Sequence, residues 1–422
     1  MGHLSTASFV EPEIRASPEG IRGAEAALVK PPRVSIINGL CVPDDAISNS
    51  IADEVRLLSD GDGETRYRPK VYAYVVRHDL ATSGRVVGLA TQILLDPHFQ
   101  QSELVIFHFG IFYPLFDLAV LASCFPRVLG RYHNVTPAEY LPAEQRGLIE
   151  KSLAQSWNLD FCDRIAADSD FSRGDLKSRG FAPEKLTTLT LSAQVAQPSR
   201  EAIAKKALNS DHLHALFVGR FVKSKGVLDL LQAARCVEER FPGLLKLTLA
   251  GNVVYSDEAY IEEVRAYIAR HFGNGQVRFE GAVSPARLQQ LYLEAELFIL
   301  PSYHEGFGVP VVEAFRSGCY VIAYSSGNLT ELVDQRGILV RTGDVDDLAA
   351  KVTEIASRFQ ASRLHARPFL VSYLGNDIPY ADYVAQIVDH SQYYDFARFR
   401  ERFWTVIRET LATPRLPRSV AL

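Results

Sequence analysis

Short apolar runs alternate with longer segments of helical period from residue 33 onward. In the first half of the chain, six runs have the pattern of buried strands: 33–38, 70–76, 103–109, 127–133, 163–169 and 185–191. Most of the segments between them are long enough for a helix, and 44–59 has the apolar spacing of one, with Asp44 or Asp45 in the capping position. This alternation predicts a parallel sheet with helices on both faces.

A polar stretch at 196–211 interrupts the alternation, which then starts again. The second set of strand-like runs covers 214–220, 244–251, 276–281, 295–302, 318–325 and 337–344. We therefore expect two doubly wound α/β domains facing each other across a cleft, with ligands beyond the carboxyl ends of the strands. The predicted divisions are a loose tail at 1–30, an N-terminal domain at 31–200, a C-terminal domain at 201–385, and a helical segment at 386–422 that returns to the N-terminal domain.

One apolar segment, 104–125, is long enough to be compared with a membrane span. It contains His108, Pro114 and Asp117, and its first residues are typical of a buried strand, so we interpret it as a strand, a loop and a core helix. The N-terminus has no basic-then-apolar pattern of a signal peptide, and the five cysteines are scattered singly. These features favour a cytoplasmic protein with reduced thiols.

The composition limits the class of ligand. The chain has 422 residues, of which 47% are hydrophobic and 23% charged, so it is too apolar to be disordered throughout. Its formal net charge of −5 argues against a protein that binds nucleic acid by neutralising phosphates. We expect no nucleic-acid partner.

Two cations follow the first strand of the second half. In FVGRFVKSKG, the strand ends at Gly219 and Arg220, and Lys225 and Gly226 come just before a helix. Arg220 can hold a diphosphate with a bidentate fork and Lys225 can hold it as a point charge; the alternative is a pair of solvated surface cations. No P-loop and no G-x-G-x-x-G pattern occurs, so neither an ATPase nor a dinucleotide enzyme is supported.

A second stretch, HEGFGVPVVEAF at 304–315, carries two glutamates eight positions apart. Glu305 lies before the predicted helix and Glu313 on its first turn. The glycines between them allow the backbone to approach a ligand, and Pro310 suits the first helical turn. The N–H groups that open the helix would point at an anion in the cleft, one glutamate could reach a sugar and the other could accept hydrogen bonds from vicinal hydroxyls.

These motifs together are similar to the retaining nucleotide-sugar glycosyltransferases of family 4, the group 1 transferases with the GT-B fold. The similarity rests on E-G-F-G-V-P-V-V-E-A at 305–314, on G-R-x(4)-K-G at 219–226, and on the strand and loop at 318–322 and 327–332. It is strong over 214–345. In the N-terminal half it is thinner and rests on DDAISN (44–49), GRYHNVTP (130–137) and SDFSRGDLKSRG (169–180).

The resemblance implies a role for each matching residue. Arg220 and Lys225 would hold the donor diphosphate, Glu313 the ribose, and Glu305 with the backbone of Gly306, Phe307, Gly308 and Val309 the donor sugar. The backbone at Ala282 and Val283 would meet the base, and Gly39 would take the place of the first glycine turn near the phosphate, although the family often has paired glycines there.

A histidine at the end of an N-domain strand meets the transferred sugar in this family. His133 in GRYHNVTP matches that position best, so we expect Glu305, His133, Arg220 and Lys225 to carry the catalysis. His108 is the second candidate, but a strand histidine among apolar residues is more often a satisfied core residue.

The resemblance also implies the reaction: retaining transfer of a mannose- or glucose-type hexose from a GDP- or UDP-sugar to a hydroxyl of a glycan or lipid-linked acceptor, without a cofactor. YHNVTP is similar to transferases that build bacterial surface polysaccharides, which favours peripheral contact with the inner membrane. D-x-D pairs occur at 60–62, 168–170 and 344–346, but acids at the last of these suit a helix cap, so we expect no metal. The alternatives are a nucleotide-sugar epimerase or hydrolase on the same scaffold and a non-catalytic nucleotide-sugar sensor.

Overall fold

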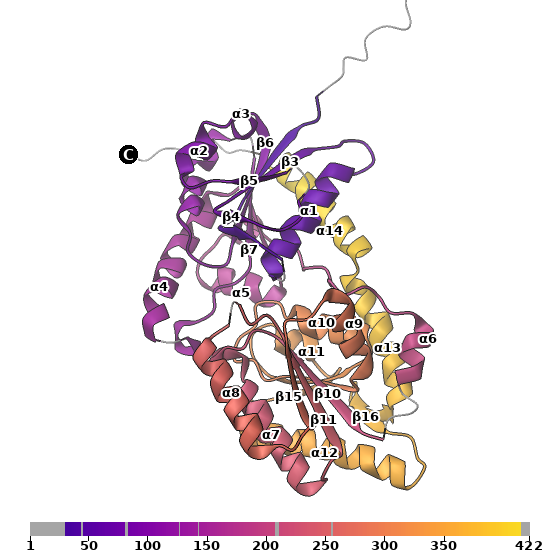
Figure 1. The fold of residues 1–422 in the computed structure, drawn as a ribbon. Coiled ribbons are helices and arrows are strands. Elements are labelled where there is room, and N and C mark those ends of the chain that lie inside the picture. Colours follow the sequence, from indigo (N-terminus) through magenta and orange to yellow (C-terminus); the bar gives the residue numbers. More distant parts are fainter. Residues whose placement is uncertain are drawn as a thin grey trace, which may run out of the picture.

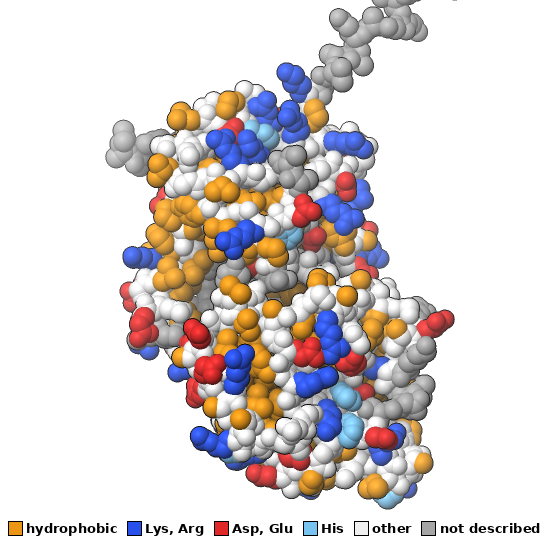
Figure 2. All heavy atoms as spheres, viewed as in Figure 1, with side chains coloured by type: hydrophobic (Ala, Val, Ile, Leu, Met, Phe, Trp, Pro, Cys, Tyr) orange, Lys and Arg blue, Asp and Glu red, His pale blue; other side chains and the backbone are white. Residues whose placement is uncertain are grey.

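The computed structural model describes residues 30–414 except 44, 81–82, 126, 142, 207–210 and 255. It has two α/β domains, one above the other in Figure 1. The predicted tail at 1–30 lies outside the described residues apart from Lys30. On the face shown in Figure 2, Lys and Arg side chains gather at the end of the N-terminal domain that lies farthest from the C-terminal domain, and charges of both signs are spread over the C-terminal domain.

The N-terminal domain is built on a seven-stranded parallel sheet in the order β5-β3-β1-β6-β7-β8-β9. Its strands are β1 (Arg33–Ile37), β3 (Arg68–Ala73), β5 (Gly84–Val86), β6 (Ser102–Phe109), β7 (Val128–Tyr132), β8 (Arg164–Ala167) and β9 (Leu186–Thr188). The six predicted strands are confirmed, and β5 was missed. Two further short strands, β2 (Leu40–Cys41) and β4 (Val75–Val76), pair with each other in parallel; β2 follows β1 in the chain and β4 follows β3.

Helices connect these strands. They are α1 (Ala46–Asp60), α2 (Ala90–Leu94), α3 (Pro97–Gln100), α4 (Arg146–Gln155) and α5 (Asp170–Ser178), with 3₁₀ turns η1 (Pro114–Cys124), η2 (Ala138–Tyr140), η3 (Ala143–Gln145), η4 (Ser156–Phe161) and η5 (Pro183–Lys185). The carboxylate of Asp45 caps α1 by accepting from the N–H of Ser48 at 2.9 Å, whereas Asp44 is outside the described residues.

The apolar segment 104–125 forms β6 and η1, so the core helix predicted there is a 3₁₀ helix. Within the described ranges, the model contains no helix with both the length and the apolar character needed to cross a membrane.

The C-terminal domain has a six-stranded parallel sheet in the order β12-β11-β10-β13-β14-β15. The strands are β10 (Leu213–Val218), β11 (Leu245–Ala250), β12 (Val277–Gly281), β13 (Leu297–Leu300), β14 (Tyr320–Tyr324) and β15 (Ile338–Val340), as predicted. Its helices are α6 (Arg200–Lys206), α7 (Val227–Arg240), α8 (Glu258–His271), α9 (Pro285–Glu294), α10 (Val309–Arg316), α11 (Leu329–Val333), α12 (Val345–Leu364) and α13 (Tyr380–Ser391), with the turn η6 (Lys223–Lys225) and the antiparallel hairpin β16 (Leu370–Tyr373) and β17 (Asn376–Pro379).

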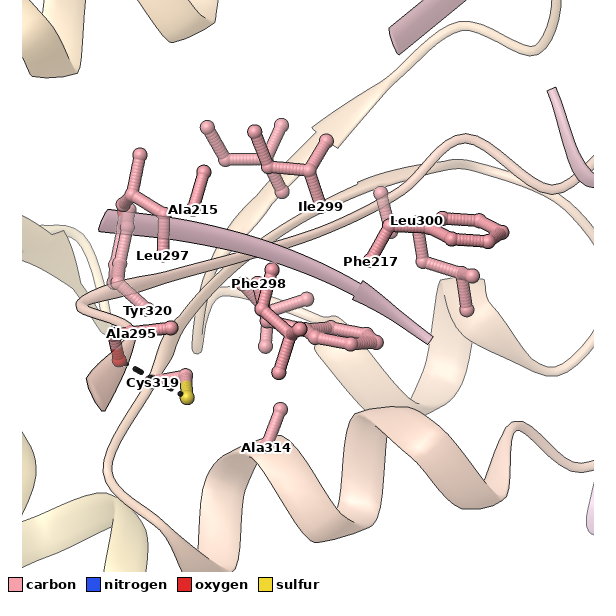
Figure 3. Packing of buried hydrophobic residues seen from close by; sticks show 14 of the residues in the cluster. Ala215, Phe217, Ala295, Leu297, Phe298, Ile299, Leu300, Ala314, Cys319 and Tyr320 are labelled. Carbon is pink, nitrogen blue, oxygen red and sulfur yellow. Dashed lines mark hydrogen bonds between the residues drawn. The ribbon is translucent and has the colours of Figure 1, made fainter. Parts of the chain in front are cut away.

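The centre of this domain explains why its strands are almost continuously apolar. Figure 3 shows Phe298 of β13 directed to the same side as Ala314 of α10, and Ile299 directed to the opposite side. All three side chains are fully buried, because helices cover both faces of the sheet. The packing fixes α10 directly below the end of β13, where the loop that carries Glu305 begins.

The last helix crosses back to the first domain. The chain leaves α13 through η7 (Gln392–Tyr394), and α14 (Phe396–Ala412) starts after Asp395, so the helical segment predicted at 386–422 is broken at 392–395. Phe399, Phe403 and Ile407 of α14 are fully buried in one cluster with β1, β3 and β6, and Figure 1 shows α14 in yellow beside the N-terminal sheet. The two domains are therefore joined by two chain crossings.

Candidate active site

The carboxyl ends of the two sheets meet at a loop of the C-terminal domain, residues 301–308, that follows β13. The carbonyl oxygen of Gly306 accepts from the Ser169 hydroxyl at 2.8 Å and from the Ser172 hydroxyl at 3.3 Å. His304 Nε2 lies 3.0 Å from Asn134 Oδ1 and donates a hydrogen bond to this amide oxygen. The loop of the E-G-F-G motif therefore sits directly against the N-terminal domain at the end of β7.

Two glycines are required by close backbone approach. A Cβ on Gly306 would lie 2.8 Å from the Cβ of Asn134 and 3.0 Å from the carbonyl oxygen of His133. Gly226 has φ +63°, and a Cβ there would lie 2.1 Å from the carbonyl oxygen of Pro301. Gly226 is thus required by its contact with Pro301, in the loop that leads into the second motif. Gly306 is required by its contact with His133 and Asn134 of the N-terminal domain.

This approach brings Lys225 and Glu305 together. Lys225 Nζ and Glu305 Oε1 form an ion pair, and the Ser302 hydroxyl donates to the same carboxylate oxygen at 2.9 Å. The two side chains are 16% and 12% exposed, so the pair is shielded from bulk water yet reachable by a ligand. An ammonium group has three donors, so Lys225 can keep this carboxylate and still donate to a phosphate oxygen.

Arg220 lies at the open end of β10. It is exposed, and its guanidinium makes no hydrogen bond or ion pair with another residue in the described part of the chain. The arrangement therefore offers one cation already paired with a carboxylate and one available to an anionic ligand.

Glu313 lies deeper than predicted. It is the fifth residue of α10, in the second turn rather than the first, and it is only 4% exposed. Tyr292 donates its hydroxyl proton to Glu313 Oε2 at 2.9 Å, and the backbone amides of Gln194 and Val195 face the carboxyl group. Burial raises the pKa of Glu313 to about 7. The contact with a ribose stays a prediction, and it requires the carboxylate to exchange these partners for hydroxyls.

His133 also differs from the expectation. Its side chain is 2% exposed and both ring nitrogens are engaged, Nδ1 with Asp168 Oδ2 at 2.7 Å and Nε2 with His108 Nδ1 at 2.9 Å. His108 Nε2 in turn lies 3.1 Å from Glu54 Oε2. In this structure His133 presents its backbone, not its imidazole, to the Gly306 loop, because the buried carboxylates hold the ring; imidazole contact with a sugar stays a prediction.

Buried hydrogen bonds run from Glu54 through His108 and His133 to Asp168, and their number fixes how many protons these side chains share. Carboxylates only accept, so the three hydrogen bonds of the chain need three protons, whereas two neutral imidazoles supply two. Arg131 completes the network as an ion-pair partner, with Nε 3.1 Å from Glu54 Oε1, not aligned for a hydrogen bond, and Nη2 3.3 Å from Asp168 Oδ1. Two carboxylates, one guanidinium and one additional proton leave the network electrically neutral.

Burial and neighbouring charges shift the pKa values of two groups in this network. Burial lowers the pKa of His108, against the opposing effect of Glu54. Burial also raises the pKa of Glu54, but the charges of His108 and Arg131 outweigh it and hold that pKa below its ordinary value.

The remaining predicted residues lie apart from the Lys225–Glu305 pair. Phe307 is buried and packs on Tyr394, with ring centroids 5.9 Å apart, and Val309 is half-buried at the start of α10. Val283 is half-buried against the C-terminal core. Gly39 is buried beside Tyr113 in the N-terminal domain. The structure thus brings Lys225 and Glu305 into one ion pair, whereas no hydrogen bond or ion pair among the described residues links Arg220, Glu313, Val283 or Gly39 to Glu305.

A cavity of 310 Å³ adjoins this loop on the side of β14 and β15. The motifs in the sequence predicted no role for the residues that line this cavity. The signal was present: Tyr303 and His304 directly precede Glu305, and Ser325, Ser326 and Gly327 belong to the loop after β14. No group of three or more His, Cys, Asp or Glu side chains in the described ranges is arranged to hold a metal ion.

Comparison with known proteins relates the C-terminal domain to the same class of protein that the sequence motifs indicate. Residues 198–362 match the family model described as glycosyl transferases group 1. O-antigen chain mannosyltransferase B of Escherichia coli is 28% identical over 237 residues, which are 54% of this chain and 61% of that protein. D-inositol 3-phosphate glycosyltransferase of Kribbella flavida is 30% identical over 220 residues, which are 49% of this chain and 51% of that protein.

Two solved structures share the whole fold. Anabaena Alr3699/HepE in complex with UDP and glucose has a TM-score of 0.68 at 16% identity, over 89% of this chain and 99% of that chain. Sucrose-phosphate synthase from Thermosynechococcus elongatus has a TM-score of 0.65 at 18% identity, over 91% of this chain and 100% of that chain. The fold is therefore GT-B, two Rossmann-like domains. Together with the family match, these findings support a group 1 glycosyltransferase.

Proposed function

We propose that this chain is a retaining glycosyltransferase of family 4 that moves a hexose from a nucleotide diphosphate sugar to a hydroxyl of a glycan or lipid-linked acceptor. The observation that carries the proposal is the Lys225–Glu305 pair, held at the opening of α10 and pressed against the N-terminal domain. A site built this way offers a cation for the leaving diphosphate and a carboxylate for the sugar in one shielded place.

The donor diphosphate would lie between Arg220, Lys225 and the start of α10. Arg220 is free to fork two phosphate oxygens, and Lys225 has donors beyond the one used by Glu305. The N–H of Val309, one of the first N–H groups of α10, has no partner inside the helix and adds the positive end of the helix dipole. These fixed groups stabilise the charge that develops on the leaving phosphate, so the site needs no metal or cofactor.

Retention would follow if the acceptor hydroxyl approaches on the face of the leaving group and gives its proton to the departing phosphate. The family resemblance supports this path, in which the departing phosphate accepts the proton and no protein side chain is needed as a general base. In that case His133 acts as a buried support for the loop rather than as an acid or base. Glu305, held by Ser302 and Lys225, would fix the sugar hydroxyls while the bond breaks.

The comparisons support a nucleotide-sugar donor and favour an acceptor that belongs to surface-polysaccharide synthesis. The similar structure of Anabaena Alr3699/HepE carries UDP and glucose, and the Escherichia coli relative is named as an O-antigen chain mannosyltransferase. We therefore favour a GDP- or UDP-hexose as donor and surface-polysaccharide synthesis as the role. We place the reaction in the cytoplasm, with peripheral contact at the inner membrane face if the acceptor is lipid-linked.

The test compares two lysines of the same turn. Lys225→Ala should lower turnover about a hundredfold or more, because removal of one fixed group at a developing charge costs on the order of 3 kcal/mol. Lys223→Ala is the matched control, since Lys223 lies exposed two residues earlier in η6. Transfer is followed with GDP-, UDP- and ADP-hexoses, in buffer with and without EDTA. Equal turnover in the two variants would refute the site, and loss of transfer with EDTA would refute metal independence.

Product analysis separates transfer from the other reactions on this scaffold. A transferase forms a new glycoside, which has the anomeric configuration of the donor if the transfer is retaining, whereas an epimerase changes the donor without an acceptor. Thermal stabilisation by each nucleotide identifies the base, because a ligand at 100 times its Kd adds about 2.7 kcal/mol to the free energy of unfolding.

A further inference from the structure

The 310 Å³ cavity beside the Glu305 loop lies between the two domains. One wall is the N-terminal loop after β7 together with α5, and the other is formed by the loops after β13, β14 and β15. It adjoins Glu305 through the backbone: Asn328 N–H donates to the carbonyl oxygen of Glu305 at 2.9 Å, and a Cβ on the wall residue Gly327 would lie 2.2 Å from that oxygen. The cavity is therefore next to the proposed sugar position.

The charges of the cavity exclude an anionic ligand. Glu139 and Asp175 line it, whereas no lysine or arginine among the described residues does, and Arg220 and Lys225 lie outside its walls. A phosphate group placed here would face the carboxylates of Glu139 and Asp175, and the arginine that pairs with Asp175, Arg179 at 3.6 Å, is not among the residues that line the cavity. The cavity is therefore not an extension of the diphosphate site, and its ligand is neutral.

Aromatic rings form much of the remaining lining. Tyr140 lies 5.9 Å from Tyr303 and 6.4 Å from the His304 ring, and Phe171 lies 6.2 Å from His304, all between ring centroids. Burial lowers the pKa of His304, so its ring is neutral at physiological pH. The negative faces of aromatic rings attract the C–H bonds of a pyranose, and carboxylates accept hydrogen bonds from its hydroxyls.

The size of the cavity suits one sugar unit rather than a whole nucleotide sugar. Its volume lies at the low end of the range of roughly 300–1,000 Å³ for ligand pockets. Serine and threonine hydroxyls from the loops after β14 and β15 add further hydrogen-bonding groups to the wall. Concave shape, aromatic faces, acceptors and hydroxyls are the combination that a polyhydroxylated neutral ligand requires.

We propose that this cavity is a subsite for an uncharged sugar unit of the acceptor, bound against the contiguous aromatic wall of Tyr140, Tyr303 and His304 with its hydroxyls on Glu139 and Asp175. The assignment as acceptor rests on the proposed glycosyltransferase function. It specifies that the sugar next to the reacting centre carries no phosphate, so any lipid diphosphate of the acceptor lies farther along the molecule.

Direct binding tests the subsite without any turnover. Saturation-transfer NMR on the full chain would compare methyl α-D-mannopyranoside with mannose 6-phosphate. We expect a signal from the neutral glycoside, at least tenfold weaker binding of the phosphorylated sugar, and at least tenfold weaker binding of the neutral glycoside to Tyr140→Ala. Tyr140→Phe should retain most of the binding, because the ring and not the hydroxyl forms the stacking face.

A charge reversal provides the second arm. Glu139→Lys should reduce the preference for the neutral sugar at least tenfold, whereas Glu144→Lys, an exposed glutamate five residues on that does not line the cavity, should keep it. Equal binding of the two sugars by the unmodified chain, or unchanged neutral-sugar binding in Tyr140→Ala, would overturn the proposal. Thermal stabilisation by GDP or UDP reports the donor site separately, so a chain that binds the glycoside through Tyr140 but turns over no donor would retain the subsite and refute the transferase.

Discussion

Glu313→Gln is the perturbation that tests the buried end of α10. Burial raises the pKa of this carboxyl from its ordinary value of 4.5 to about 7 in the folded protein. The folded state therefore binds more protons than the unfolded state between these two pH values, and stability falls as the pH rises from 4.5 to 7. The difference corresponds to roughly 3 kcal/mol at 1.36 kcal/mol per pKa unit. Glutamine resembles the protonated carboxyl and does not ionise.

The assay is thermal unfolding at pH 5 and at pH 8. Near pH 5, just above the ordinary pKa of 4.5, the variant should melt within roughly 2–3 °C of the unmodified chain, whereas at pH 8 it should melt roughly 6–12 °C higher, since a domain of this size gains about 2–4 °C per kcal/mol. Glu262→Gln, at a side chain that is 67% exposed, controls for the loss of a surface carboxylate and should stay within a degree or two at pH 8. An equal change in melting temperature at both pH values in Glu313→Gln would refute the reasoning.

The same variant also tests the predicted ribose contact. If Glu313 accepts hydrogen bonds from ribose hydroxyls, Glu313→Gln should bind GDP or UDP at least severalfold more weakly although it is more stable at pH 8, because a charged acceptor makes the stronger hydrogen bond. Stabilisation with unchanged nucleotide affinity would assign Glu313 to the fold alone.

Two further substitutions follow from the geometry. Gly226→Ala should lower both stability and turnover, because a Cβ would meet the carbonyl oxygen of Pro301 at 2.1 Å and the backbone must move at the residue next to Lys225; unfolding and transfer assays on one preparation check this. Asp168→Asn should destabilise the N-terminal domain by about 3–5 kcal/mol, since it leaves the buried Arg131 without one of its two carboxylates, while Asp170→Asn, at a side chain that is 60% exposed, should change the free energy of unfolding by less than about 0.5 kcal/mol. Equal denaturation midpoints for the two aspartate variants would contradict the charge count of the network.

The fold could be predicted because its sheets are covered on both faces. A strand buried on both sides is a continuous apolar run, and the runs predicted as strands in both halves of the chain became strands of the two parallel sheets. β5 was missed because its three residues, Gly84–Val86, lie at the sheet edge and are exposed or half-buried, so no apolar run marks them. The break at 392–395 was missed because Asp395 lies within a stretch whose aromatic spacing continues on both sides.

The candidate site was predictable in the parts that depend on local spacing. Lys225 and Glu305 belong to motifs with glycines that permit close approach, and the structure brings them into one ion pair. The surroundings of Glu313 and His133 were not predictable, because their partners Tyr292 and Asp168 come from other elements, 21 and 35 positions away in the chain. Whether a titratable side chain faces a ligand or a buried partner depends on such tertiary contacts, and spacing along one element does not contain them.

The position of α10 gives these separate contacts a common consequence. Its first turn carries the E-G-F-G loop, and its other end is tied to both chain crossings between the domains: Arg316 pairs with Asp395 before α14, and the Arg316 carbonyl oxygen accepts from Gln197 at 3.3 Å. The two crossings also bond to each other, with Ala193 N–H donating to the Tyr394 carbonyl oxygen at 3.0 Å. A helix of two turns buried in a packed core moves as one body. A displacement of its first turn would therefore be transmitted through Arg316 to both segments that connect the two domains.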